Sequence, residues 1–401
     1  MAKKLSSILG IDIGSKKIKV CEIRTQGREP VVTALGMIDT PEGAVDHTGV
    51  YNSDAVAVAL KQVLNDAGAS IPYAVVSIAG QSSVLVRILE VPKMNPAELK
   101  DHMQWEINRN IPFAESTVVS DFKPLPSDDP NSANMDVVMA IAPQSAIDTM
   151  VACIKRAGKT LAAIDVEPMS IARSIQTSYD DVLQSKTVCV VDVGHKTTSI
   201  NIFKGSKLVM PRQVPIGGEM FTKAISDELH LSISDSENLK LTKGEVPESA
   251  ADAGSAPTPS FGATQEFQPY NPFSDDPVPA PAAFDEPAPT AVAVGLDDPE
   301  SARVYGAIAS LLDEFVAEIR RSIDYFRSRG GEVDKIVLCG GGTKLKGLAS
   351  FLGKSLAIEC DDYDPFRRLN INARKVAPGF VEEHRQEFAV AVGNGLHILF
   401  D

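Results

Sequence analysis

The amino-acid sequence predicts a duplicated α/β fold, and three observations point to it. Two segments that lie 180 residues apart, Leu9–Val20 and Cys189–Ile200, share the pattern of an apolar strand, a turn and a second strand. Segments with helical periodicity separate and follow them. A mostly apolar strand, Lys335–Cys339, then leads into a glycine triplet. Apolar strands that alternate with helices are typical of sheets covered by helices on both faces.

The two repeated segments have the signature of β-hairpins. In the second strand of the first hairpin, Lys17 and Lys19 alternate with Ile18 and Val20, which is the pattern of a half-buried strand. We expect a glycine in each turn because tight turns often require positive φ. The positions that correspond in the two copies are Asp12 and Asp192, Gly14 and Gly194, and Lys16 and Lys196.

Four segments predict helices by the spacing of their apolar residues. The longest is Ala302–Arg329, which ends before two glycines, as a C-terminal glycine cap requires. The others are Asp54–Asp66, Gln144–Ala157 and Ser170–Ser178.

Residues 246–300 differ in composition from the rest of the chain. They contain no Lys or Arg, ten acidic residues and eleven prolines, without hydrophobic periodicity. Such a segment buries too little apolar surface to offset the entropy of ordering, so we expect a disordered insertion. Its aromatic residues allow two interpretations, short docking motifs or a plain spacer; they are Phe261, Phe267, Tyr270, Phe273 and Phe284.

Composition argues against several classes of protein. With 39 Lys and Arg against 53 Asp and Glu, the net charge of −14 gives no overall attraction to nucleic acid. The sequence has no run of 18 or more apolar residues, so no membrane span is expected. The first residues do not have the pattern of a secretory signal. Five cysteines without CxxC spacing disfavour structural zinc and disulfides and favour a reducing cytoplasm. The six histidines form no cluster, so a transition-metal site is not expected.

The two glycine-containing turns suit the phosphates of a nucleotide. Backbone N–H groups of such turns form an anion-binding nest, and Asp12 and Asp192 beside them supply oxygens for Mg²⁺ through its water shell. The glycine triplet allows close approach of a flat nucleoside. A glycine pair opens a helix on which Glu219 and Lys223 are expected to reach the ribose or base. The expected nucleotide-binding residues are Asp12, Gly14, Ser15, Lys16, Lys17, Asp192, Gly194, His195, Lys196, Thr197, Thr198, Gly217, Gly218, Glu219, Lys223, Gly340, Gly341, Gly342 and Thr343.

The order of these motifs, completed by Ala389–Leu396, resembles the actin-like ATPase superfamily, which includes actin, sugar kinases, heat-shock chaperones and the cell-division protein FtsA. The resemblance implies a duplicated actin-like (ribonuclease H-like) ATPase fold in two lobes that binds ATP and Mg²⁺. Asp165–Pro168 is similar to the first segment that connects the lobes. Glu167 would then act as a general base or, without driving hydrolysis, order metal-bound water. Lys16 and Lys196 would neutralise phosphates or remain solvated turn residues.

One stretch, Pro96–Phe113, closely resembles the PilM family of type IV pilus assembly proteins through its Gln-Trp-Glu-Ile and Ile-Pro-Phe sequences. In that family the stretch belongs to a small α+β subdomain inserted in the first lobe. A groove beside this subdomain receives the cytoplasmic tail of the inner-membrane protein PilN. The runs Ala74–Val91 and Val118–Leu125 are similar to its strands. Trp105 is either a groove-lining aromatic or an ordinary packed ring.

The resemblance also implies a division of the chain. Residues 1–73 form the first-lobe core with the first phosphate hairpin, 74–143 the inserted partner-binding subdomain, and 144–186 the first-lobe completion and connecting helix. Residues 187–245 carry the second phosphate hairpin, 246–300 the acidic insertion, and 301–401 the second-lobe completion with the adenosine motif and return helix.

The function that the resemblance implies is a cytoplasmic, ATP-binding adaptor with at most slow ATP hydrolysis. It binds a PilN-like tail in a nucleotide-dependent way, meets other pilus assembly proteins, and reaches the inner membrane only through partners, in a pilus or a related type II secretion-like system. An FtsA-like polymerising protein is one alternative, although residues 396–401 show no amphipathic membrane-targeting pattern. A small-molecule kinase is the other, although no sugar-site signature occurs between Val31 and Ala140.

Overall fold

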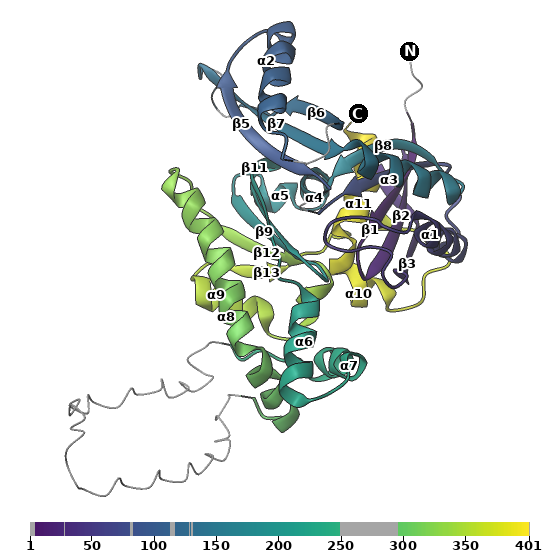
Figure 1. The fold of residues 1–401 in the computed structure, drawn as a ribbon, viewed down its shortest axis with the longest axis vertical. Coiled ribbons are helices and arrows are strands. Elements are labelled where there is room, and N and C mark those ends of the chain that lie inside the picture. Colours follow the sequence, from purple (N-terminus) through teal and green to yellow (C-terminus); the bar gives the residue numbers. More distant parts are fainter. Residues whose placement is uncertain are drawn as a thin grey trace, which may run out of the picture.

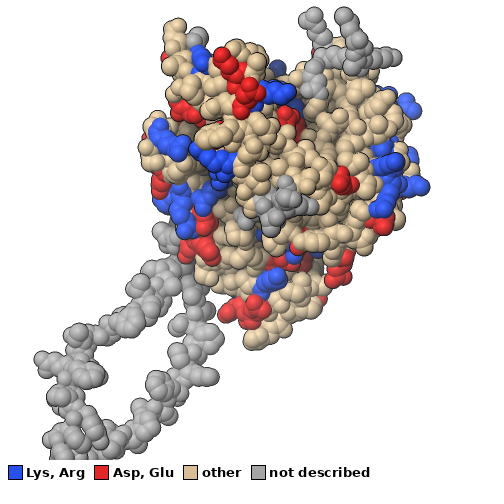
Figure 2. Space-filling model, turned by 45° about the horizontal axis from the view of Figure 1, so that its top comes forward, with Lys and Arg blue, Asp and Glu red and all other residues tan. Residues whose placement is uncertain are grey.

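The computed structural model describes residues 5–27, 29–80, 83–112, 117–127, 129, 131–248 and 296–400. Three β-sheets with helices packed around them form two lobes and a small projecting subdomain (Figure 1). On the face shown in Figure 2, acidic and basic side chains are interspersed. Within the described residues no helix is both long and apolar enough to cross a bilayer.

The first lobe is built on a six-stranded sheet with the strand order β14-β3-β2-β1-β4-β8. Helices α1 (Ser53–Ala67) and α3 (Gln144–Arg156) bury their apolar stripes on one face of this sheet. Helix α11 (Ala389–Gly395) covers the other face. The strands are β1 (Ser7–Ile13), β2 (Lys17–Gln26), β3 (Glu29–Asp39), β4 (Tyr73–Ile78), β8 (Thr160–Val166) and β14 (Asn370–Ile371).

The second lobe repeats this plan around a five-stranded sheet with the order β11-β10-β9-β12-β13. Helices α6 (Gly218–Leu229), α8 (Pro299–Ser328) and α9 (Leu348–Leu356) pack on one face, and α4 (Glu167–Ser178) packs on the other. Helix α7 (Ile233–Lys243) lies beside α6 at the far end of the lobe (Figure 1). The remaining elements are β9 (Thr187–Val193), β10 (Thr198–Lys204), β11 (Lys207–Val214), β12 (Lys335–Cys339), β13 (Cys360–Asp362), α5 (Asp180–Leu183) and α10 (Phe380–His384).

The subdomain is an antiparallel sheet, β5 (Leu85–Pro92), β7 (Asn134–Pro143) and β6 (Val118–Pro124), covered by α2 (Pro96–Arg109). An Asn95 and Glu98 capping box starts α2. Trp105 is 55% exposed, with the Arg109 guanidinium 4.5 Å from its ring centroid. The interpretation of Trp105 as an ordinary packed ring is therefore wrong, and Trp105 does not line the cavity between the lobes. Phe113 lies outside the described residues.

The four predicted helices and the strand Lys335–Cys339 are confirmed, with helix ends that differ by up to three residues. One assignment is wrong. Strand β4, expected in the inserted subdomain, pairs in parallel with β1 in the first-lobe sheet. The Gly-Gln-Ser-Ser stretch at residues 80–83 interrupts the apolar run at the point where the chain changes sheets between β4 and β5.

The edges of the acidic insertion are also ordered, contrary to expectation. Val246 is buried in the second-lobe core, its N–H donates to the Lys346 carbonyl, and α8 already begins at Pro299. Average composition over the segment hides these anchoring residues. Residues 249–295, which include the five aromatic residues, lie outside the described residues.

Buried hydrogen bonds of Asn394 hold helix α11 against β1, β4 and α4. Asn394 donates to the Ile11 carbonyl at 2.8 Å and accepts from the hydroxyls of Ser77 and Ser170 at 2.9 and 2.7 Å. Backbones approach so closely that a Cβ on Gly393 would lie 1.9 Å from the Ser170 carbonyl oxygen. The end of β1, where the first turn begins, is thereby tied to α4.

Replacing Gly393 with Ala tests this contact. Because the added methyl group has no room, we expect the free energy of unfolding to fall by about 1–3 kcal/mol, measured by urea denaturation. Gly306→Ala in α8 is the matched control. Its Cβ meets nothing within 4 Å, so it should leave stability unchanged or raise it by about 0.5–1 kcal/mol. If the two variants are equally stable, the backbone contact at Gly393 is not as close as the structure indicates.

Candidate functional site

A cavity of about 1170 Å³ lies between the lobes and brings most of the predicted residues together. Those that line it are Asp12, Gly14, Ser15, Lys16, Lys17, Glu167, Asp192, Gly194, His195, Lys196, Thr197, Gly218, Gly340, Gly341 and Gly342. Thr198, Gly217, Glu219, Lys223 and Thr343 do not line it. A cavity of this size is large enough for a nucleotide.

The two hairpin turns close in the same way. The N–H of Gly14 donates to the Lys17 carbonyl at 3.1 Å, and that of Gly194 donates to the Thr197 carbonyl at 3.0 Å. Neither glycine has positive φ, so that expectation is wrong. Glycine is required because a Cβ would lie 2.9 Å and 2.7 Å from those carbonyl oxygens, respectively.

Two glycines of the triplet are required by close contacts with strand β9. Gly340 has a φ of 89°, and a Cβ there would lie 2.3 Å from an Asp192 carboxylate oxygen. At Gly342 a Cβ would lie 2.4 Å from a Val193 methyl group. Close approach to β9 therefore explains these two glycines, and Gly341 has the most space of the three.

Three of the carboxylates that line the cavity, those of Asp12, Glu167 and Asp192, are near enough to interact electrostatically. Asp12 accepts a hydrogen bond from Lys19 at 2.8 Å across the first hairpin. Burial would lower the pKa of Lys19, but Asp12 outweighs it and raises that pKa. Burial, and then repulsion by neighbouring carboxylates, raises the pKa of Glu167. Burial also raises the pKa of Asp192, against the attraction of Lys19.

This cluster fits a cation held through water. The Oε1 of Glu167 is buried without a hydrogen-bond partner, and an unsatisfied buried oxygen favours a nearby positive charge. In the part of the chain that the structure describes, no three His, Cys, Asp or Glu side chains are close enough to bind a metal ion together. Mg²⁺, which keeps several of its waters, is compatible with this arrangement.

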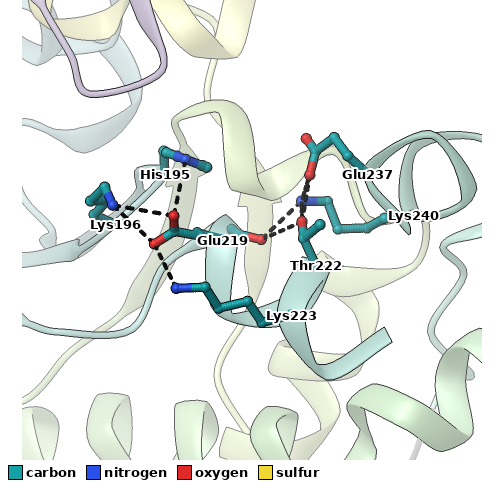
Figure 3. Close-up of polar contacts among 8 residues, drawn as sticks. His195, Lys196, Glu219, Thr222, Lys223, Glu237 and Lys240 are labelled. Carbon is teal, nitrogen blue, oxygen red and sulfur yellow. Dashed lines mark hydrogen bonds and ion pairs between the residues drawn. The ribbon is translucent and has the colours of Figure 1, made fainter. Parts of the chain in front are cut away.

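Several polar side chains of the second lobe pair with each other beside the cavity (Figure 3). The Nζ of Lys196 is 3.2 Å from each carboxylate oxygen of Glu219, and Lys223 is 3.4 Å from the same carboxylate. In the first lobe, Lys17 of β2 likewise pairs with Asp39 of β3 at 2.7 Å. The predicted nucleotide contacts of Glu219, Lys223 and Lys17 therefore compete with ion pairs within the protein.

The sequence analysis missed three groups that line the cavity. Lys19 could have been found, because pairing the hairpin strands sets it opposite Asp12. The pair Glu237 and Lys240 lies on α7, which has a weak helical pattern and was not predicted. Lys344, His384 and Glu387 form a third group, in which Lys344 is 2.7 Å from Glu387 and His384 is 2.8 Å from it. These three residues share no motif, so no sequence signal joins them.

Comparison with known proteins identifies two families. The model of the family "Type IV pilus assembly protein PilM" matches residues 10–254, and that of "Cell division protein FtsA" matches residues 189–393. FtsA of Neisseria meningitidis is 24% identical over 58% of this chain and 60% of its own length. FtsA of Pseudomonas aeruginosa is 26% identical over the same shares. This chain thus spans about three fifths of the length of these relatives.

Solved structures support the predicted fold. A "PilM-PilN type IV pilus biogenesis complex" matches with a TM-score of 0.77 and 25% identity over 99% of both chains. The ethanolamine utilization protein EutJ of Carboxydothermus hydrogenoformans matches with a TM-score of 0.53 and 11% identity, over 98% of this chain and 91% of that one. The actin-like α/β fold expected from the sequence is confirmed.

Because the carboxylate of Glu167 is buried and its pKa is raised, we expect removal of its charge to stabilise the folded protein. Without nucleotide or divalent cation, Glu167→Gln should be more stable than the wild type by about 1–2 kcal/mol at pH 8. A raised pKa means that the wild type loses stability as pH rises above about 4.3, where an unfolded Glu ionises. The difference in unfolding free energy, measured by urea denaturation, should therefore shrink toward pH 4.

Glu22→Gln is the matched control because Glu22 is also buried but has the opposite shift. Burial would raise the pKa of Glu22, but hydrogen bonds led by the N–H of Ile71 outweigh it and lower that pKa. Glu22→Gln should therefore lower stability at pH 8. A destabilised Glu167→Gln variant with the same pH profile as Glu22→Gln would contradict the prediction.

Proposed function

Because this chain belongs to the family of the type IV pilus assembly protein PilM, we propose that it is an ATP-binding adaptor in the assembly machinery of a pilus or a related system. It would hold the cytoplasmic tail of a PilN-like inner-membrane protein and reach the membrane through that partner. The observation that carries the proposal is the single cavity lined by both hairpin turns, three carboxylates and the glycine triplet.

The two turns would hold the phosphates of ATP. Their backbone N–H groups and the side chains of Lys16 and Lys196 supply hydrogen-bond donors and positive charge. Asp12 and Asp192 would bind Mg²⁺ through its waters, and Glu167 would order one of them. Mg²⁺ supplies positive charge next to the phosphates. We assign the protein slow hydrolysis at most, because a binding switch needs only the bound nucleotide.

The same cavity continues beside the inserted subdomain, where a partner segment would bind. Its lining there includes Tyr51, Gly80, Ser83, Pro112 and Pro143. Tyr51 is 64% exposed, so its ring is available to a partner. Since the nucleotide and the tail would share one cavity, the position of the lobes that ATP favours would also set the shape of the tail groove. Coupling of this kind is a population shift between two states.

Asp12→Asn and Asp192→Asn test the nucleotide site. Each removes a charge that would hold Mg²⁺, so we expect ATP affinity measured by calorimetry to fall at least tenfold and to lose most of its Mg²⁺ dependence. Asp181→Asn is the control because Asp181 pairs with Arg367 outside the cavity, and it should bind ATP normally. If Asp12→Asn and Asp192→Asn both bind ATP with wild-type affinity, these two residues do not belong to a nucleotide site.

A titration of the partner's tail peptide tests the adaptor role. Affinity should rise with ATP and Mg²⁺ by about 5–150-fold, the range of typical coupling energies. Tyr51→Ala should weaken binding, whereas Tyr325→Ala on α8, at 51% exposure, should not. Identical affinity with and without ATP would refute the coupling, and unchanged binding by Tyr51→Ala would refute the location of the groove.

A further inference from the structure

A second, smaller cavity of about 430 Å³ lies between the inserted subdomain and the second lobe. Its walls include β5 of the subdomain, β10 and β11 of the second lobe, and the first turn of α4. It adjoins the cavity between the lobes, because Glu167 lines both. Since one water molecule takes up about 30 Å³ of liquid, this second cavity has room for a small ion with several waters.

An unsatisfied amide lies in the wall of the second cavity. The side chain of Asn201 on β10 is 1% exposed and lines this cavity. Its Nδ2 is buried and has no hydrogen-bond partner among the residues that the structure describes. A buried donor without a partner destabilises the folded protein. A ligand with an acceptor oxygen would satisfy this donor, so the amide favours an acceptor in the second cavity.

The first turn of α4 supplies further donors at the same place. Helix α4 has 12 residues, and no side chain caps its N-terminus. Its residue Pro168 lines the second cavity but not the cavity between the lobes. The first N–H groups of a helix have no partner within it, and the helix dipole adds partial positive charge there. Helix N-termini therefore bind anions, and the unsatisfied amide of Asn201 points to the same class of ligand.

Two guanidinium groups add positive charge to the second cavity. Arg212 on β11 lines it, although this side chain also donates to Glu318 at 2.6 Å. Arg87 on β5 lines it too, and donates at 2.7 Å to the neutral amide oxygen of Asn110. Among the described residues, the one carboxylate in the wall is that of Glu167. Burial, and then repulsion by neighbouring carboxylates, raises the pKa of Glu167 to about 8, so it opposes an anion less than an ordinary carboxylate does.

We propose that the second cavity binds free inorganic phosphate, held by the amide of Asn201, the N-terminus of α4 and the guanidinium groups of Arg87 and Arg212. A tetrahedral oxyanion suits these donors because they approach from four different elements. Since Arg87 belongs to the subdomain and Asn201 to the second lobe, a bound phosphate would link these two parts. The inference goes beyond the proposed ATP binding, because this phosphate would lie outside the turns that would hold the nucleotide.

Calorimetric titration of the full chain with inorganic phosphate, at constant ionic strength, tests the site. The protein is first saturated with Mg²⁺ and the slowly hydrolysed analogue AMPPNP. The analogue would fill the cavity between the lobes and supply no phosphate, so only added phosphate can bind. The wild type should still bind it. Asn201→Leu should weaken binding about tenfold or more, the effect of a lost hydrogen bond to a charged group. This variant should be no less stable to urea, because it removes an unsatisfied donor.

Arg87→Gln provides a second variant, and Arg109→Gln is its matched control. Arg109 lies on α2 of the same subdomain but does not line the second cavity. Both substitutions remove one positive charge from the subdomain. Only Arg87→Gln should weaken phosphate binding, because its charge lies in the wall of the cavity.

Several results would overturn the proposal. The wild type binds no phosphate, Asn201→Leu binds it as the wild type does, or Arg87→Gln and Arg109→Gln lose equal affinity, which would indicate a general effect of surface charge. Loss of phosphate binding when AMPPNP is added would place the phosphate in the cavity between the lobes instead. If AMPPNP itself does not bind, the proposed function fails. The effect of Asn201→Leu on phosphate binding by the nucleotide-free protein then decides this inference separately.

Discussion

Three carboxylates held close together in a buried cleft are the constraint on which this structure depends. Burial and mutual repulsion both oppose ionisation of Glu167 and Asp192, and among the residues that the structure describes only Lys19 forms an ion pair with Asp12. Such a cluster is unfavourable for folding by itself. It persists because packing elsewhere holds the two hairpins in place, which is the pattern expected of a site that is stabilised by its ligand.

The packing that opposes this repulsion lies directly behind the cluster. Asn394 links β1, β4 and α4 through three hydrogen bonds, and every partner in that contact is buried. At Gly10 and Gly393 the backbones approach so closely that a Cβ would clash, so α11 packs tightly against β1 and α4. A rotation of one lobe against the other would therefore have to alter this contact. If a partner or nucleotide changes the angle between the lobes, we expect the change to occur between discrete packing arrangements, because tightly packed contacts do not deform continuously.

The sequence predicted the repeated plan better than the details of the site. Local signals were sufficient for the hairpins and the long helix, because strand alternation and helical spacing depend on neighbouring residues. The placement of β4 in the first sheet was missed because Ala74–Val91 was interpreted as one run, although Gly-Gln-Ser-Ser at residues 80–83 interrupts it between β4 and β5. Glu237 was missed for another reason. It reaches the cavity from α7, which has a weak pattern, and its partner Thr222 lies on another helix.

The two copies of the repeat are unequal where chemistry would occur. In the first hairpin Asp12 faces Lys19, whereas the corresponding position opposite Asp192 is Ser199. The first copy therefore neutralises its own carboxylate, and the second leaves Asp192 with a neutral neighbour close to Glu167. An added cation would gain most from the side of Asp192 and Glu167, where negative charge is not compensated. Duplication thus provides two similar turns, and the presence of Ser199 where the first copy has Lys19 leaves more uncompensated negative charge on the side of the second turn.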